Sequence, residues 1–108
     1  MNLEVALKYC MDSKSFTIQM LTTFAEGSKK ADKIEEKFAA QDWKNYQILV
    51  HALKSTSMSI GAENLSEAAK ALEFAAKNDE TEKILSEHAA LMEFYAKVRE
   101  EITQWLKS

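Results

Sequence analysis

The sequence has few of the residues that interrupt helices or cross-link a chain. It contains no proline, two glycines and one cysteine among its 108 residues. Proline and glycine disfavour helix interiors, so their scarcity favours an all-α fold. A lone cysteine excludes an internal disulfide, but a chain of this length can bury a core without one. We therefore expect residues 1–108 to form a single all-α domain.

Long hydrophobic runs and an excess of basic charge are also missing. No apolar run approaches the roughly 18 residues needed to cross a bilayer, and Glu4 stands where a signal peptide would have a basic start. The formal net charge of -3 argues against nucleic-acid binding, which usually requires a concentrated basic face. These absences predict a cytoplasmic protein that neither inserts into a membrane nor binds nucleic acid.

The motifs of several enzyme and metal-binding classes are absent as well. There is no Gly-x-x-x-x-Gly-Lys loop for ATP, so we predict no kinase activity for the chain itself. The serines near His51 lack the orienting acid and oxyanion hole of a hydrolytic triad. Helical bundles often bind metal through Glu-x-x-His pairs, but Ile48 and Leu85 stand three residues before the two histidines. Zinc-ligand spacing is also absent, and we predict no metal site.

Apolar residues recur at three- and four-residue steps along most of the chain. The pattern predicts a short helix over residues 3–11 and longer ones over 14–40, 42–61, 62–77 and 79–107, with Gly27 bending or dividing the second. Asp79 and Glu82 have the spacing of a capping box for the last helix. Short connections favour antiparallel neighbours. We expect an up-and-down antiparallel four-helix bundle with a short additional N-terminal helix.

The helix predicted over residues 42–61 begins at Asp42, a good N-cap, and has a histidine at its middle. At about 100° per residue, its predicted core stripe is Tyr46, Leu49, Leu53, Thr56 and Ile60. His51 lies opposite that stripe, and Lys54 lies one turn further along the same side. Periodicity alone leaves open a solvated histidine without function. His88, in contrast, falls on the apolar side of its helix and is predicted to be a partly buried structural residue.

One set of residues in this region forms a recognisable pattern. His51-Ala52-Leu53-Lys54 is followed in register by Gly61-Ala62, Leu65-Ser66 and Leu72-Glu73. The pattern resembles the signature of histidine-containing phosphotransfer (HPt) domains, and the resemblance covers nearly the whole chain. The chain departs from the family pattern at Ser55, where glycine is usual. A side chain there would either crowd a partner or add a hydroxyl near the phosphoryl group.

The resemblance implies a phosphorelay intermediate. His51 would accept a phosphoryl group from the aspartyl phosphate of one receiver domain and pass it to an aspartate of another. Lys54 would stabilise the phosphoryl oxygens electrostatically, and Mg2+ would be bound by the receiver. The implied partners are response-regulator receiver domains and a hybrid histidine kinase. The chain would be either a stand-alone HPt domain or a domain excised from a longer hybrid sensor kinase.

The surface around His51 is the predicted docking site for the receiver. Its expected contacts are Ile48 and Met58 as apolar residues, Lys44, Gln47 and Ser55 at the rim, and Lys70, Glu73 and Lys77 on the following helix. Gly61 is predicted to serve the turn, where a left-handed backbone suits glycine, and not to contact phosphate.

Two other functions stay open on the sequence alone. The first is a helical adaptor that docks receivers without carrying phosphate, an alternative that Ser55 keeps open. The second is the dimerisation segment of a histidine kinase, which would require a two-helix dimer and an adjoining ATP-binding domain. Five helical segments in one short chain make a monomer the simpler expectation.

Overall fold

The structure is entirely helical. The computed structural model describes all 108 residues and contains six helices and no strand. The helices are α1 (Leu3–Tyr9), α2 (Lys14–Ala25), α3 (Ser28–Ala39), α4 (Trp43–Ser59), α5 (Glu63–Lys77) and α6 (Thr81–Lys107). The predicted all-α class is confirmed. No helix combines the length and the apolar composition that a bilayer span requires.

The helix predicted over residues 14–40 is divided into α2 and α3 at Gly27. The side chain of Tyr95 on α6 approaches the backbone there, and its hydroxyl donates a hydrogen bond to the Gly27 carbonyl at 3.4 Å. A Cβ atom on Gly27 would lie 2.5 Å from the Tyr95 hydroxyl oxygen. The break therefore occurs where only glycine lets α6 come this close.

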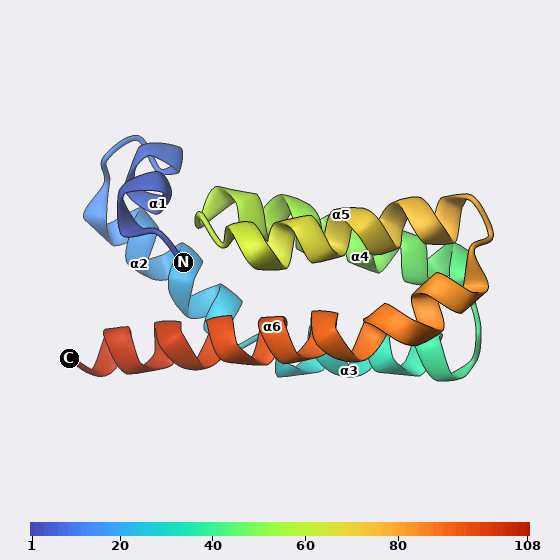
Figure 1. Cartoon of the computed structure of the whole chain (residues 1–108). Coiled ribbons are helices and arrows are strands. Elements are labelled where there is room, and N and C mark those ends of the chain that lie inside the picture. The colour runs from blue at the N-terminus through green and yellow to red at the C-terminus, as the bar shows by residue number, and fades with distance from the viewer.

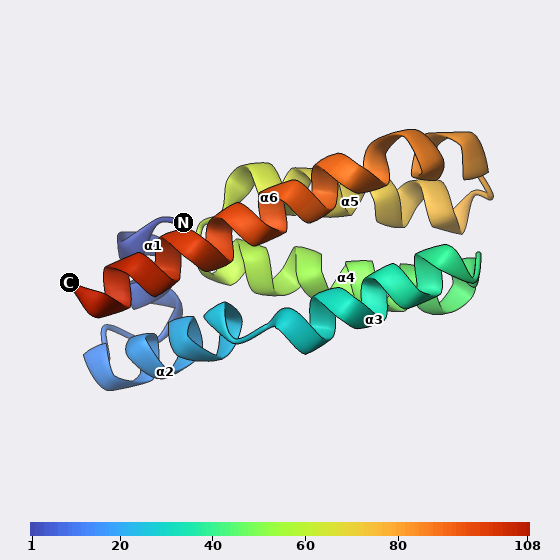
Figure 2. The same ribbon diagram turned by 90° about the horizontal axis from the view of Figure 1, so that it is seen from below.

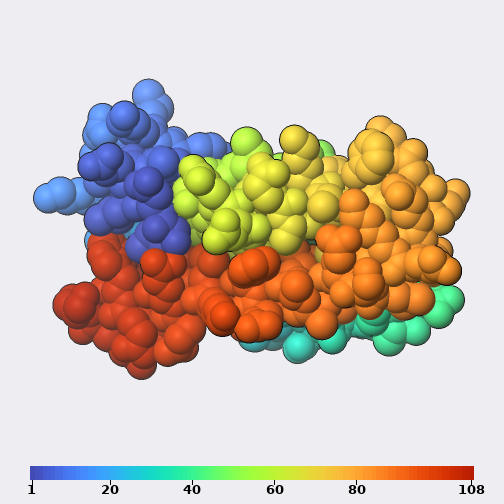
Figure 3. All heavy atoms as spheres, in the orientation of Figure 1, coloured from blue at the N-terminus to red at the C-terminus, as the bar shows by residue number.

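An antiparallel four-helix bundle forms the body of the molecule, as predicted (Figures 1 and 2). Helices α4 and α5 lie side by side, and α5 packs in turn on α6. Two helices in succession, α2 and α3, form the fourth column of the bundle. Helix α3 packs on α4, and α2 packs on the C-terminal part of α6. Helix α1 covers one end, beside the α4–α5 connection (Figure 3). The resulting bundle measures 41 × 21 × 18 Å.

Four of the five turns between helices share one C-terminal geometry, and the exception is the turn at Gly27, where φ is −79°. The residues after α1, α3, α4 and α5 all adopt positive φ, and they are Met11, Gln41, Gly61 and Asp79. After α5, the Glu80 N–H reaches the Ala75 carbonyl at 2.8 Å, which is the long hydrogen bond of a Schellman motif. The predicted capping box at Asp79 is therefore wrong. A left-handed residue ends α5, whereas an N-cap needs an extended backbone, and the N-cap of α6 is Glu80 without a side-chain hydrogen bond.

The buried face of α4 differs in part from the predicted stripe. Its buried residues are Tyr46, Val50, Leu53 and Ser57, followed by Ile60 at the C-cap. Thr56, predicted to be in the core, is exposed, and Leu49 is half-buried. The stripe is rotated because α4 packs most extensively on α5, which covers the side carrying Val50 and Ser57. Fully buried alanines at 69 and 75 on α5 leave room for that approach.

Candidate functional site

The middle of α4 carries His51 on the outside of the bundle. The helix begins at its predicted N-cap, where the Asp42 carboxylate accepts a hydrogen bond from the Asn45 N–H at 3.3 Å. It then runs without a break to Ser59, so the register from the cap to the histidine is fixed. The His51 side chain is 57% exposed. A second protein can therefore reach the imidazole without any rearrangement of the bundle.

One carboxylate, Glu73 of α5, binds both polar side chains of the predicted site. Its Oε2 accepts a hydrogen bond from His51 Nδ1, and its Oε1 accepts one from Lys54 Nζ at 2.7 Å. The Glu73 side chain is only 17% exposed. Burial alone would raise the pKa of this carboxyl, but the hydrogen bonds from Lys54 and His51 outweigh burial, and the pKa is lowered. Glu73 is consequently an ionised acceptor at neutral pH.

The Glu73 contact determines the tautomer of His51. An ionised carboxylate can only accept hydrogen bonds, so the proton of the neutral ring must reside on Nδ1. Nε2 then carries the lone pair, and no group in the chain forms a hydrogen bond with it. In this tautomer the site presents one oriented ring nitrogen with a lone pair at the surface. Such a nitrogen is a competent nucleophile near pH 7.

The other predicted site residues surround this centre in different ways. Ile48 and Met58 are 59% and 61% exposed. Lys44, Ser55, Lys70 and Lys77 are exposed and Gln47 is half-buried. Glu73, expected among the outer contacts, instead lies inward against His51 and Lys54.

A shallow groove runs beside Lys54 between α4 and α5. Its volume is about 390 Å³, and its lining includes Lys54, Met58, Gly61 and Lys70. Gly61 has a φ of +69°, and a Cβ atom there would lie 2.5 Å from the Asn2 Cβ. Glycine is thus favoured by the left-handed turn and required by the packing of the segment before α1. The groove brings four of the predicted site residues together.

Sequence reasoning did not identify the role of Glu73. It grouped Lys70, Glu73 and Lys77 as contacts on one helix, and Glu73 is the only acid among them. An acid on a face that otherwise carries lysine was the available signal. The contacts of Glu73 with His51 and Lys54 depend on how α4 and α5 are aligned along each other. The periodicity of a single helix does not predict that alignment.

The second histidine occupies a closed environment. His88 is 4% exposed, and its ring stacks on Phe38 with centroids 3.8 Å apart. Its Nδ1 is 2.8 Å from the Tyr46 hydroxyl, and its Nε2 contacts Glu35. Burial, with a smaller contribution from Glu35, raises the pKa of Tyr46, which stays protonated and donates to Nδ1. Glu35 is therefore the acceptor for His88 Nε2–H.

Metal binding has no visible basis in the arrangement of side chains. No group of three histidine, cysteine, aspartate or glutamate residues lies close enough together to hold an ion.

Comparisons with known proteins agree with the fold and with the sequence pattern. The family model described as "Hpt domain" matches residues 19–107. Among solved structures, the chain is similar to the HPT domain from the Hpt sensor hybrid histidine kinase from Shewanella, with a TM-score of 0.88 and 19% sequence identity. That alignment covers 99% of this chain and 93% of the other. A search of curated proteins found no match. At this identity the structural likeness concerns the fold.

Proposed function

This chain belongs to the Hpt domain family, and we propose that His51 is its phosphoryl acceptor in a multi-step His–Asp relay. Membership of the family places the chain in two-component phosphotransfer. The observation that carries the assignment to His51 is its exposed imidazole, whose Nδ1 contacts Glu73 and whose Nε2 forms no hydrogen bond within the chain. His88 has both ring nitrogens occupied inside the bundle and is no alternative acceptor.

The proposed step is a displacement at phosphorus. The Nε2 lone pair attacks the phosphorus of a receiver's aspartyl phosphate, so an N–P bond forms while the O–P bond of the acyl phosphate breaks. The aspartate leaves with the electron pair as a carboxylate. The ring retains its Nδ1 proton and gains positive charge, which the Glu73 carboxylate stabilises through the existing hydrogen bond. Transfer to a second receiver is the reverse displacement with a different aspartate.

Lys54 supports the same step from the other side of Glu73. Its ammonium has three N–H donors, and only one is used in the 2.7 Å bond to Glu73 Oε1. The side chain is 24% exposed, so the remaining donors can reach phosphoryl oxygens arriving at His51. Lysine acts here as a compact charge that needs no proton transfer. Mg2+, in this proposal, is bound by the receiver and neutralises the phosphoryl group from the partner side.

The proposed partners are response-regulator receiver domains and a hybrid histidine kinase, met in the cytoplasm by a monomeric chain. The exposed Ile48 and Met58 would contact an apolar patch of the receiver around its acidic site. Lys44, Lys70 and Lys77 at the rim would attract that acidic site at long range. Gln47 and Ser55 complete the proposed contact surface.

The alternative function is a receiver-binding adaptor that carries no phosphate. The observation that favours it is Ser55, which is exposed one residue after Lys54, where a partner would approach. In that case receiver binding would persist while phosphohistidine never forms. Ser55→Gly separates the two functions, because a crowding effect predicts faster transfer in the variant and a pure adaptor predicts none in either protein.

The test of the proposed function is phosphoryl transfer from a phosphorylated receiver. The chain should acquire acid-labile label, whereas His51→Gln should acquire none while retaining its helical circular dichroism. His88→Gln is the matched control and should still be labelled under conditions where it is folded. Equal labelling of wild type and His51→Gln would show that the acceptor has been assigned wrongly.

A further inference from the structure

A second concave region lies on the other flank of α4, between the α2–α3 elbow and α6. Its larger part has a volume of about 360 Å³ and is lined by α2, the first turn of α3, the end of α4 and Tyr95. A smaller part of about 240 Å³ continues along α3 and α4. The two parts meet at Lys30, Thr56 and Tyr95. We call the combined region the elbow groove.

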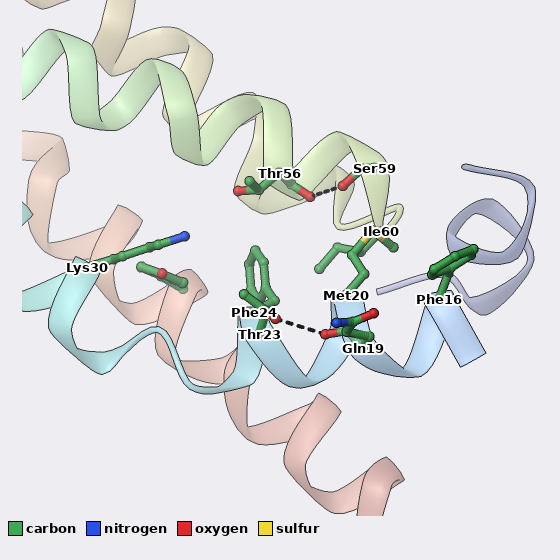
Figure 4. Close-up of a pocket in the computed structure, with 10 residues that line it drawn as sticks. Phe16, Gln19, Met20, Thr23, Phe24, Lys30, Thr56, Ser59 and Ile60 are labelled. Carbon is green, nitrogen blue, oxygen red and sulfur yellow. Dashed lines mark hydrogen bonds between the residues drawn. The ribbon is translucent and has the colours of Figure 1, made fainter. Parts of the chain in front are cut away.

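The floor of the elbow groove is apolar and fixed. Phe24, Ile60 and Tyr95 are all buried, and the Phe24 and Tyr95 rings pack edge to face with centroids 5.5 Å apart. Met20 lies beside them and Phe16, which is 63% exposed, stands at the rim. Figure 4 shows Phe24 rising from α2 toward α4. A concavity of this size with an apolar floor and a few polar groups is the usual form of a small-molecule site.

The charge of the elbow groove is opposite to that of the whole chain. The chain has 17 acidic and 14 basic residues, yet no acidic residue lines either part of the groove. Its charged residues are Lys30 and Lys33, and neither forms an ion pair with the chain. Figure 4 shows the Lys30 side chain reaching from α3 toward Thr56 on α4. An unpaired ammonium at an apolar concavity favours an anion with an apolar body.

The hydroxyl groups of the groove narrow the choice of ligand. Thr23, Thr56 and Ser59 already donate to backbone carbonyls at 2.9, 3.1 and 2.7 Å. Each can still accept a hydrogen bond but has no proton left to give. Lys30 is the one cation that lines both parts of the groove, so it is placed to pair with the acid group of a ligand. The hydroxyls suit a neutral N–H or O–H of the ligand.

We propose that the elbow groove binds a small organic anion with an apolar body, its acid group pairing with Lys30 Nζ. Ala52, which directly follows His51, lines the groove together with Leu49 and Thr56. An occupant would therefore lie beside the helix that carries the exposed histidine. The inference itself rests on the lining and charge of the groove, so it holds or fails independently of phosphoryl transfer.

A matched pair of probes tests the proposal directly. 8-Anilinonaphthalene-1-sulfonate has a sulfonate, an anilino N–H and an aromatic body, and N-phenyl-1-naphthylamine is nearly the same molecule without the acid. Titration of 15N-labelled wild-type chain with the sulfonate should shift the amide signals of the groove residues, including Thr23, Lys30 and Thr56. The neutral probe should bind more weakly at the same place.

Two charge variants on neighbouring positions provide the control. Lys30→Gln should weaken sulfonate binding about five-fold, as expected for one lost charge pair near the surface, with little effect on the neutral probe. Lys29→Gln removes the same charge from an exposed lysine that does not line the groove, and it should bind the sulfonate like wild type. Circular dichroism verifies that both variants are folded.

Three results would overturn the proposal. Shifts confined to other exposed apolar residues, such as Phe74 and Leu85, would place the probe elsewhere. Equal binding of the two probes, or equal losses in Lys29→Gln and Lys30→Gln, would remove the role of Lys30. If neither probe binds but a receiver domain shifts the groove signals, the groove is a protein contact and not a small-molecule site.

Discussion

The two histidines of this chain have the same type of partner and opposite surroundings. Each forms a hydrogen bond with a glutamate from another helix, Glu73 for His51 and Glu35 for His88. His51 uses Nδ1 and leaves Nε2 in solvent, whereas His88 uses both nitrogens and stacks on Phe38. The comparison shows that a glutamate contact alone does not distinguish the two histidines. The difference is the free second nitrogen.

The largest expected effect is a difference in unfolding free energy between variants of His88 and His51. His88→Ala removes a stacked ring from a packed site and leaves the buried Tyr46 hydroxyl without its partner, so it should lower the unfolding free energy by about 2–4 kcal/mol. His51→Ala, on an exposed helix face, should change it by less than about 1 kcal/mol. Urea unfolding followed by circular dichroism measures both. Similar losses in the two variants would break the comparison.

The next effect concerns the carboxylate that orients His51. Glu73→Ala removes the group that fixes the tautomer and stabilises the charged ring, so phosphoryl transfer should slow on the order of 10- to 100-fold. Glu73→Gln keeps an acceptor for Nδ1–H but removes the charge, so its transfer rate should lie between those of Glu73→Ala and wild type. Glu87→Gln, an exposed acid on α6, serves as the control. An unaltered rate in Glu73→Ala would mean that Nε2 needs no help from this residue.

A smaller effect is expected from the lysine of the site. Lys54→Ala should slow transfer about ten-fold, because one electrostatic contact to the phosphoryl group is lost. Its stability should change by less than about 1 kcal/mol, as for a partly exposed ion pair. The rate is measured by stopping the reaction at intervals, separating the proteins on a gel and counting the label in the chain. A large loss of stability instead would make Lys54 a structural residue.

The smallest effect is the pH dependence of the Glu73 contacts. The pKa of Glu73 is lowered from its usual value of 4.5, so its hydrogen bonds stabilise the folded chain above that pH and cease to do so as the pH falls through the lowered pKa. The stability gap between wild type and Glu73→Gln should accordingly be widest near neutral pH and close in acid. Urea midpoints at several pH values measure it. A gap that does not vary with pH would contradict the ionised state of Glu73.

Much of the fold could be predicted because it depends on local signals. The cap at Asp42, the glycine at 61 and the apolar periodicity indicated α4 to within a residue or two. The exposure of His51 and the burial of His88 followed from the same periodicity. The break at Gly27 was foreseen as a bend or a division, although its cause, the approach of Tyr95, is a contact between distant segments.

The features that could not be predicted all depend on how two helices meet. The rotation of the α4 stripe toward Val50 and Ser57 reflects its packing on α5. The contacts of Glu73 with His51 and Lys54 depend on the same interface. A helical wheel gives the face on which a residue lies but not the residue opposite it. The resemblance to a known family pointed to His51 as the proposed acceptor, and the structure shows the carboxylate that contacts it.

The central claim is that Nε2 of His51 takes the phosphoryl group because Glu73 holds the proton on Nδ1. NMR of the chain with 15N-labelled histidine rings, before and after phosphorylation, tests it most directly. The account predicts a protonated Nδ1 in the free chain and phosphorus coupling at Nε2 of His51 in the phosphorylated one, with His88 unchanged. Phosphorus coupling at Nδ1 of His51, or at either nitrogen of His88, would contradict it.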